Sequence, residues 1–312
     1  MKKRDFEEIL KNYSLGKYKS SEHIWWAFGN TVFILKTSKG KYLLKKFHSS
    51  NNRKINFQVE VMELLNSKGL PVPKIHRTKK GKLILKYKSN FLILQKFVEG
   101  KATYSFTKAL VKDCAKILSK TDKILKNLRK KPLFEWKKNH QFNSRNLTIK
   151  KVENFNLKQE SVKIEGELKR INRSKLSKSL IHSDAHGINL LSRKNKIVAL
   201  IDFDDLHYDY LSEEIAVFLT CLVHKDKIYK DFIRVFVNEY KKELPLNKEE
   251  KKAIYYFMKK RFLGAIDWTE KHKRKLKDKK KIEKTNKNIQ DSIKSYLNLD
   301  KISLDEFIGI IS

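Results

Sequence analysis

Three oxygen-bearing side chains with a spacing that suits metal and phosphate chemistry lie in the stretch 180–205, which reads LIHSDAHGINLLSRKNKIVALIDFDD. Asp184 and Asn189 lie in its polar first half, and Asp202 follows an apolar run. We predict a loop, a strand, a tight basic turn at 193–196 and a second strand. An antiparallel return of the second strand would bring Asp202 beside Asn189 and Asp184. Such oxygens suit Mg²⁺, which usually completes its shell with substrate phosphates.

Two other interpretations of this stretch are open. His182, Asp184 and His186 have a metal-like spacing, but a zinc site needs three or four ligands, and no further His/Cys cluster at ligand spacing is visible. The stretch could also be a polar loop between core strands, which is how a lone H-x-D would be interpreted. The order and spacing of Asp184, Asn189 and Asp202 weigh against that second interpretation.

The pattern H-x-D-x-x-x-x-N, followed by an apolar strand and D-F-D, resembles the catalytic and metal-binding loops of the protein-kinase-like fold. It is most similar to the aminoglycoside phosphotransferase, choline kinase and type II homoserine kinase superfamily, including bacterial spore-coat kinase-like proteins. Those families often show H-G-D-x-H-x-x-N; here Ser183 replaces the Gly, and the second His is His186. The resemblance spans about residues 25–260. It implies an α+β bilobal fold, with a small β-rich nucleotide-binding lobe at 1–98 and a larger, mostly helical catalytic and acceptor-binding lobe at 99–312.

The resemblance also implies a role for each residue of the motif. Asp184 would orient an acceptor hydroxyl and could deprotonate it, and His182 would brace the catalytic loop. Asn189 and Asp202 would hold Mg²⁺ against the β- and γ-phosphates of ATP, and Asp204 would be a second metal contact.

The region 22–47 is expected to cover the nucleotide, because two β-rich runs around a Gly turn predict a hairpin. By the resemblance, the earlier turn Gly29-Asn30-Thr31 would lie over the phosphates, although a plain hairpin turn is equally consistent with one Gly. Lys45 follows an apolar pair, as the motif requires, and would contact the α- and β-phosphates. Lys46 is expected on the opposite face of the strand.

Residues 53–68 predict an amphipathic helix that ends at the sequence G-L-P-V-P. The resemblance requires this helix to supply a carboxylate that holds Lys45, and our choice is Glu60. Alignment backwards from G-L-P-V-P instead places Gln58 where relatives often carry Glu, so the partner of Lys45 is open between these two residues.

Two further strands are predicted at 82–88 and 91–98. The second resembles the strand that connects the lobes, where backbone groups read the nucleotide base. By position, the backbones of Lys96 and Val98 would meet adenine. The alternative is an ordinary edge strand that ends at Gly100.

The rest of the chain is predicted to be mainly helical. Residues 5–20 predict a helix with Phe6, Ile9, Leu10 and Tyr13, followed by a Gly-Lys loop, and Trp136 and Phe142 are expected to pack locally. The other predicted helices are 104–128, 162–171, 213–219, 226–242, 247–270 and a terminal helix within 293–311.

The composition limits the class of protein. A length of 312 residues with 40% hydrophobic residues suits one large domain or two lobes around a real core. No run of 18 apolar residues predicts a membrane span, and the basic N-terminal residues lack the apolar core of a secretory peptide. Cys114 and Cys221 are the two cysteines, which indicates no disulfide framework and suits a reducing cytoplasm, with spore association left open.

The net charge of +36 would attract nucleic acid, anionic membrane or phosphorylated ligands. Lys is far more frequent than Arg, however, and is spread throughout the chain, whereas nucleic-acid sites usually concentrate Arg and aromatic residues on one face. We therefore expect a Lys-rich background that adds some attraction for nucleotides, and not a specific nucleic-acid site.

Together these features predict an ATP- and Mg²⁺-dependent phosphotransferase that acts on a hydroxyl of a small molecule. The candidate acceptors are an amino or sugar alcohol, homoserine, choline or ethanolamine, and an aminoglycoside. The positive charge disfavours a polycationic acceptor unless four acids, Asp205, Asp209, Glu213 and Glu214, line an acidic pocket. Two other classes are open: a non-catalytic kinase-like scaffold such as a spore-coat component, and an atypical protein kinase or RNA-associated kinase. The sequence fixes neither the oligomeric state nor the choice between ATP and GTP.

Overall fold

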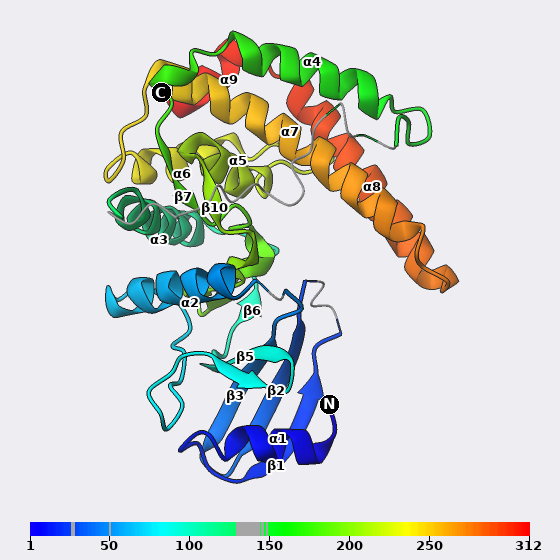
Figure 1. The fold of residues 1–312 in the computed structure, drawn as a ribbon. Coiled ribbons are helices and arrows are strands. Elements are labelled where there is room, and N and C mark those ends of the chain that lie inside the picture. Colours follow the sequence, from blue (N-terminus) through cyan, green and yellow to red (C-terminus); the bar gives the residue numbers. More distant parts are fainter. Residues whose placement is uncertain (26–28, 50, 129–143, 145–146, 148) are drawn as a thin grey trace. The chain divides into compact units, whose positions relative to one another are not determined.

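The computed structural model describes residues 1–25, 29–49, 51–128, 144, 147 and 149–312. Trp136 and Phe142, which we expected to pack locally, lie outside these residues. The chain forms two compact units: Met1–Ala102 with Leu190–Asp204, and Thr103–Asn189 with Asp205–Ser312. The segment Leu190–Asp204 thus groups with the N-terminal residues, and the lobe boundary between residues 98 and 99 stays a prediction. Strands dominate the first unit and helices the second, which confirms the predicted α+β class (Figure 1).

The first unit is built on a five-stranded antiparallel sheet with the order β1-β2-β3-β5-β4. Its strands are β1 (Tyr18–His23), β2 (Thr31–Thr37), β3 (Gly40–Lys46), β4 (Leu85–Tyr87) and β5 (Asn90–Lys96). The predicted hairpin is β2 and β3, which pair from Thr31↔Lys46 to Thr37↔Gly40. The second predicted strand pair is β4 and β5, which pair through Leu85↔Leu92 and Tyr87↔Asn90.

Helix α1 (Lys3–Leu10) packs on one face of this sheet and closes its core (Figure 1). The apolar side chains of α1 meet alternate residues of the strands, because successive side chains of a strand point to opposite faces. The buried residues of this cluster are Phe6, Ile9, Leu10, Tyr13, Phe33, Leu35, Tyr42, Leu44, Leu92 and Leu94. Since Leu44 faces α1, its neighbour Lys45 points to the other face of the sheet.

The helix predicted within residues 5–20 is shorter than expected. It ends at Leu10, and Tyr13 is buried in the core from the following turn. Gly16 has a φ of +89°, and β1 begins at Tyr18. A left-handed backbone conformation, which favours glycine, turns the chain here into a strand.

Helix α2 (Asn52–Ser67) lies within one residue of its predicted bounds, and the side chain of Asn51 caps it by accepting from the Lys54 N–H. A three-stranded sheet completes the unit, with the order β6-β8-β9. Its strands are β6 (Lys101–Ala102), β8 (Leu190–Arg193) and β9 (Lys196–Leu200). The pairs Leu190↔Leu200 and Arg193↔Lys196 confirm the predicted antiparallel hairpin, which ends beside Asp202 in the chain.

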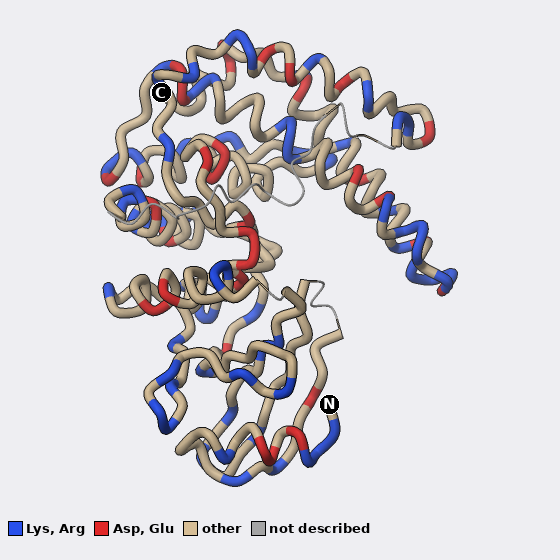
Figure 2. Tube along the Cα trace, in the orientation of Figure 1, with Lys and Arg blue, Asp and Glu red and all other residues tan. Residues whose placement is uncertain are grey.

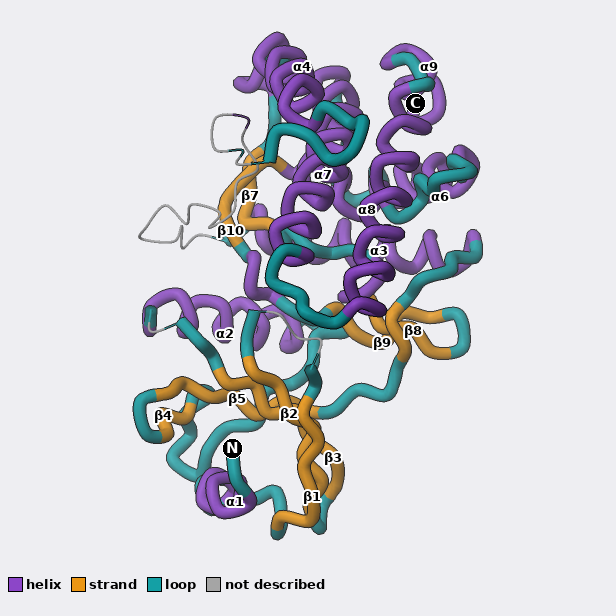
Figure 3. Tube along the Cα trace, turned by 90° about the vertical axis from the view of Figure 1, so that its right-hand side faces the viewer, coloured by secondary structure: helices purple, strands orange, loops and turns teal. Residues whose placement is uncertain are grey.

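The second unit holds seven helices among the described residues and a two-stranded sheet of β7 (Lys178–Ile181) and β10 (His207–Tyr210) (Figure 3). The helices are α3 (Lys108–Lys126), α4 (Leu157–Arg170), α5 (Leu211–Thr220), α6 (Lys230–Tyr240), α7 (Lys248–Lys273), α8 (Lys279–Asp300) and α9 (Leu304–Ile311). Helix α7 is the longest of them and contacts α4, α5, α8 and α9. The side chain of Asn247 caps α7 in a capping box with Glu250, so the helix is anchored at its start.

The basic residues are spread over both units, and a dense run covers the end of α7 and the first turns of α8 (Figure 2). None of the helices in the described part of the chain is both long enough and apolar enough to cross a membrane.

Candidate functional site

Lys45 is the centre of a charged cluster in the first unit. Its Nζ lies 2.7 Å from Asp204 Oδ1 and 3.1 Å from Asp202 Oδ1. The Lys45 side chain is only 10% exposed, so this ion pairing holds the ammonium in place. Strand β3 delivers Lys45, and the end of the β8–β9 hairpin delivers the two carboxylates. The structure thus brings together three of the residues that the sequence predicted.

Asp204 also accepts hydrogen bonds from two amides. Gln58 Nε2 in α2 donates to Oδ1 over 2.8 Å, and Asn30 Nδ2 donates to Oδ2 over 2.6 Å. A Cβ on the neighbouring Gly29 would lie 3.4 Å from Asp204 Oδ2, at van der Waals contact. The predicted phosphate turn therefore touches the Lys45 cluster, which we define as Asn30, Lys45, Gln58, Asp202 and Asp204.

One histidine, His48, contacts the same turn at two points. Asn30 Oδ1 accepts from the His48 N–H over 2.8 Å, and the Thr31 hydroxyl lies 2.7 Å from His48 Nε2. Asn30 is thus held by its oxygen while its nitrogen reaches Asp204. His48 was not predicted, because a partner 17 to 18 residues along the chain, just after β3, has no distinctive pattern in the sequence.

The structure corrects our choice of Glu60. Glu60 is exposed, whereas Gln58 is 3% exposed and reaches Asp204. Residues two apart on a helix point about 200° away from each other, so only one of them can face the cluster. The position given by the alignment from G-L-P-V-P, Gln58, is the one of the two that faces the cluster. The acid that neutralises Lys45 comes from the D-F-D segment and not from α2.

The three charges of the cluster shift one another's pKa. Burial lowers the pKa of Lys45, but Asp202 and Asp204 outweigh it and raise the pKa above its ordinary range. Burial raises the pKa of Asp204, but the charge and hydrogen bond of Lys45 and the hydrogen bond from Gln58 lower it to about 2. The charge of Lys45 lowers the pKa of Asp202, whereas partial burial and the charge of Asp204 raise it to about 6. Asp204 is therefore the fixed anion of the cluster.

The predicted base-reading segment lies at the end of β5. The Lys96 N–H donates to the Lys74 carbonyl oxygen over 2.8 Å, so this donor is already used. Val98 follows the strand and is half-buried. A base could therefore meet the Lys96 backbone only through its carbonyl oxygen.

The loop that carries the predicted catalytic residues begins directly after β7 in the second unit. Ser183 has a φ of +68°, the left-handed conformation that explains why relatives place Gly there. Its N–H donates to Glu214 Oε2 over 2.6 Å, and Glu214 is fully buried in the first turn of α5. His182 is also fully buried, and its Nδ1 lies 3.3 Å from the Asp184 N that donates to it. His182 and Glu214 thus hold the backbone on either side of Ser183.

Gly187 is required by a close approach in the same loop. Its carbonyl oxygen accepts from the Thr103 N–H over 2.7 Å, and a Cβ at this position would overlap the Thr103 carbonyl oxygen. The turn that follows places Asn189, whose Nδ2 donates to both the carbonyl oxygen and Oδ2 of Asp184, over 2.9 and 2.8 Å. Because the nitrogen makes both contacts, Oδ1 of Asn189 is the atom that could bind a cation.

Asp184 has a cationic partner that the sequence reasoning missed. Arg261 Nη2, from the middle of α7, lies 2.5 Å from Asp184 Oδ1, and His186 Nε2 lies 3.3 Å from the same oxygen. Burial raises the pKa of Asp184, but the hydrogen bond from His186 and the charge of Arg261 hold it well below its usual range. Asp184 is therefore ionised at neutral pH. One signal was available: Arg261 is an Arg in a chain whose basic residues are mostly Lys.

The zinc interpretation of His182, Asp184 and His186 gains no support. In the parts of the chain that the structure covers, the group of side chains with metal-ligand proximity is a different one, His207, Asp209 and Glu213. The four acids considered as an acidic pocket also have separate surroundings. Glu214 is buried under the catalytic loop, whereas Asp209 and Glu213 lie beside His207.

Comparisons with known proteins identify the family and the fold. The sequence profile of the phosphotransferase enzyme family matches residues 22–243. Among solved structures, a microcompartment-associated aminopropanol kinase superposes with a TM-score of 0.75 at 13% identity, over 98% of this chain and 98% of that one. An amicoumacin kinase in complex with AMP-PNP, Ca²⁺ and Ami gives 0.72 at 16% identity, over 97% and 95%. The choline kinase LicA from Streptococcus pneumoniae gives 0.66 at 14% identity, over 94% and 98%. These likenesses confirm the predicted protein-kinase-like fold.

Proposed function

The chain belongs to the phosphotransferase enzyme family and is a small-molecule kinase, and on that premise we propose that it transfers the γ-phosphate of ATP to a hydroxyl in a Mg²⁺-dependent reaction. The observation that carries the proposal is that the functional set is complete. Lys45 and Asp202 form an ion pair in the first unit. Asp184 and Asn189 are hydrogen-bonded to each other in the second unit. A non-catalytic scaffold would have had no need to keep all four.

Lys45 would steady the α- and β-phosphates. Its ammonium is a compact charge, and Asp202 and Asp204 keep it protonated and in place. The turn at Gly29 and Asn30 is already tied to Asp204, so the same carboxylate would position both the ammonium and the phosphate turn. For the base, we propose the Lys96 carbonyl oxygen as acceptor and the Val98 N–H as donor.

Asn189 and Asp202 would hold Mg²⁺, and their chemistry fits this ion. Oδ1 of Asn189 is the amide oxygen left over from the contacts with Asp184, and Asp202 is the more exposed of the two carboxylates beside Lys45. When bound, Mg²⁺ would neutralise charge on the β- and γ-phosphates. Asp204 would act as a second ligand through Oδ2, which accepts one hydrogen bond from Asn30 and retains a second lone pair.

Asp184 would orient the acceptor hydroxyl and accept its proton late in the reaction. A carboxylate whose pKa is held low by His186 and Arg261 is a weak base, so early removal of the proton is disfavoured. Phosphoryl transfer tolerates a weak base, because its transition state is loose and depends mainly on positioning and charge neutralisation. Asp184 is ionised and held by three side chains, which suits that positioning role.

Arg261 also bears on the acceptor. Its guanidinium lies against the carboxylate that must meet the hydroxyl, so the negative charge of Asp184 is already neutralised and would not attract a cationic acceptor. Among the predicted acceptors, one that carries a carboxylate or no net charge fits this arrangement better than a polycation such as an aminoglycoside. An amino acid with a hydroxyl, such as homoserine, and a sugar alcohol both satisfy the condition.

The proposal is tested by ADP release with Mg-ATP across a panel of hydroxyl-bearing amino acids, amino alcohols, sugars and aminoglycosides. Asp184→Asn would be compared with wild type, and Asp231→Asn, which changes an exposed acid on α6, would be the matched control. We expect acceptor-dependent release that falls by at least about 10³ in Asp184→Asn, equivalent to about 4 kcal/mol. No release with any acceptor, together with no thermal stabilisation by Mg-ATP, would favour the scaffold.

A further inference from the structure

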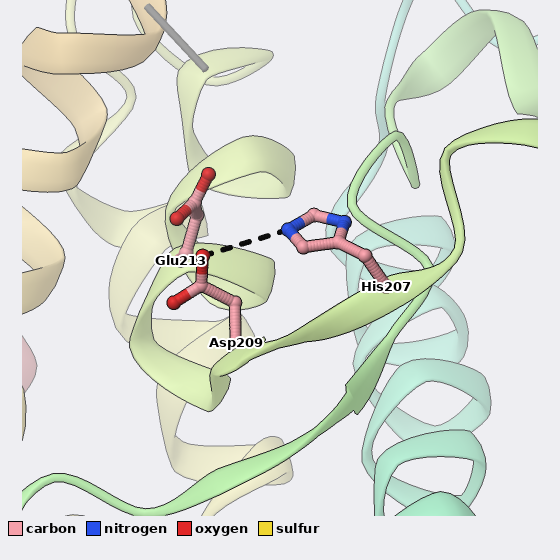
Figure 4. A group of neighbouring side chains, drawn as sticks. All are labelled: His207, Asp209 and Glu213. Carbon is pink, nitrogen blue, oxygen red and sulfur yellow. Dashed lines mark ion pairs between the residues drawn. The ribbon is translucent and has the colours of Figure 1, made fainter. Parts of the chain in front are cut away.

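A second group of possible metal ligands lies where β10 leads into α5. His207 and Asp209 belong to β10, and Glu213 lies in the first turn of α5 (Figure 4). One ligand atom from each of them lies within 4.8 Å of the other two. None of these three residues belongs to the functional set proposed above.

Local structure explains why the three side chains meet. Alternate residues of a strand point to the same side, so His207 and Asp209 share one face of β10. Strand β10 pairs with β7 through His207↔Ile181 and Asp209↔Ser179, which fixes the strand. The chain then enters α5 at Leu211, and the first turn of that helix carries Glu213 back towards the pair.

The hydrogen bonding of His207 defines which ring nitrogen carries a proton. Its Nδ1 lies 2.7 Å from the Asp205 carbonyl oxygen, which can only accept, so Nδ1 must donate. In the neutral ring, Nε2 then presents a lone pair. Nε2 is buried, has no hydrogen-bond partner among the described residues, and lies 3.5 Å from Asp209 Oδ2. A buried lone pair that faces a carboxylate is repulsive unless a positive charge lies between them.

We propose that His207 Nε2 and the carboxylates of Asp209 and Glu213 bind a divalent transition-metal ion of the zinc type. A metal-binding histidine usually donates its other ring N–H to a carbonyl or carboxylate, as His207 does to Asp205. Ligands about 2.0–2.2 Å from zinc lie about 3.4 Å apart in a tetrahedral site. The His207–Asp209 separation is close to this value, and Glu213, which offers a carboxylate oxygen within 4.8 Å of both, would supply the third ligand and leave a fourth position open.

The nitrogen ligand separates this site from the proposed Mg²⁺ site. Imidazole suits zinc and related ions, whereas Mg²⁺ takes oxygen ligands and retains several waters. The two sites also share no ligand, because Asn189 and Asp202 were assigned to Mg²⁺. A test that uses zinc in the absence of nucleotide is therefore independent of the phosphotransferase reaction.

A metal ion bound at this site would link β10 to the first turn of α5. The residue after Glu213 is Glu214, which accepts the Ser183 N–H of the catalytic loop over 2.6 Å. A metal ion that fixes the first turn of α5 would therefore also restrain the buried carboxylate that shapes that loop. We expect the bound ion to raise the melting temperature of the protein.

The experiment measures Zn²⁺ binding to the chelator-treated full-length chain by equilibrium dialysis without nucleotide. His207→Gln and Glu213→Gln would be compared with wild type, and His224→Gln, an exposed histidine in the turn after α5, is the matched control. We expect one Zn²⁺ per chain in wild type and in the control. Removal of a residue that only hydrogen-bonds to a metal ligand lowers metal affinity by about 10- to 100-fold, and we expect a larger loss of Zn²⁺ affinity in both variants. A large excess of Mg²⁺ should not displace the ion.

Two results would overturn the proposal. One is a wild type that binds no stoichiometric Zn²⁺, which would mean that a second proton on His207 supplies the positive charge. The other is unchanged affinity in both variants, which would place the bound ion elsewhere. Circular dichroism of each variant without metal separates loss of binding from loss of folding, and Glu213→Gln is the milder change if His207→Gln fails to fold.

Discussion

The substitution Gln58→Glu tests whether the acid that neutralises Lys45 comes from Asp204 instead of from α2. Gln58 Nε2 now donates to Asp204 Oδ1 over 2.8 Å. A carboxylate in its place would face Asp204 at about that distance, where two unit charges repel by about 6 kcal/mol at an effective dielectric constant of 20. The protein can avoid this cost by protonating the new carboxyl group, which restores a donor to Asp204.

Protonation sets the size and the pH dependence of the effect. Keeping a carboxyl of ordinary pKa, about 4.3, protonated at pH 7 costs about 3.7 kcal/mol. The alternative is the ionised carboxylate, whose repulsion from Asp204 is partly offset by attraction to Lys45. The cheaper of the two states sets the loss, so we expect the free energy of unfolding to fall by about 2–4 kcal/mol at pH 7. The new carboxyl has a raised pKa in the folded state. Its favourable contribution is therefore complete below about pH 4.3 and lost as the pH rises, so the difference from wild type should shrink towards pH 4.3.

Urea denaturation of wild type and Gln58→Glu at several pH values measures this difference. Gln58→Met removes the donor without adding charge, and its smaller loss of stability should be independent of pH. Glu60→Gln, on the exposed face of the same helix, should leave stability unchanged. The reasoning is refuted if Gln58→Glu is as stable as wild type at pH 7, because a carboxylate on α2 would then be an equally good partner for Lys45.

Three further outcomes follow from the contacts of single residues. Lys45→Met should lower kcat/KM by about 10²–10³ by removing a preorganised charge, whereas a purely structural lysine would change stability and leave the rate of the folded enzyme unaltered. Arg261→Met should raise the pKa of Asp184 and move the acidic limb of the pH–rate profile upward, with partial recovery in Arg261→Lys; an unchanged profile would mean that Arg261 has only a packing role. Burial and the charge of Glu214 raise the pKa of Asp122 above its ordinary range despite its hydrogen bond from Tyr240. Wild type should therefore lose stability relative to Asp122→Asn as the pH rises from about 4 to 7, which melting temperatures across that range would measure.

The parts of the site that follow from local patterns could be predicted from the sequence. The β-rich runs around a Gly turn predicted the hairpin that carries Lys45, and the basic turn between two apolar runs predicted the β8–β9 hairpin. The glycine missing at Ser183 was recognised as a departure from the family pattern. The structure adds its cause, a positive φ, and a stabilising partner in Glu214.

The parts that depend on distant segments could not be predicted. Arg261 is 77 residues from Asp184 in the chain and meets it only because α7 packs in the core of the second unit. The choice between Glu60 and Gln58 depends on which side of α2 faces the cluster. The spacing of the apolar residues does not define the orientation of the helix precisely enough to separate these two polar positions. The convergence of Asp202 with Asp184 and Asn189 stays a prediction.

The most direct test of the central claim follows the label from [γ-³²P]ATP in a reaction with Mg²⁺ and the acceptor panel. We predict that wild type transfers the label to a small-molecule acceptor, and that Asp184→Asn and Lys45→Met leave it on ATP. Label that accumulates on protein, or transfer that is unchanged in both variants, would contradict the account.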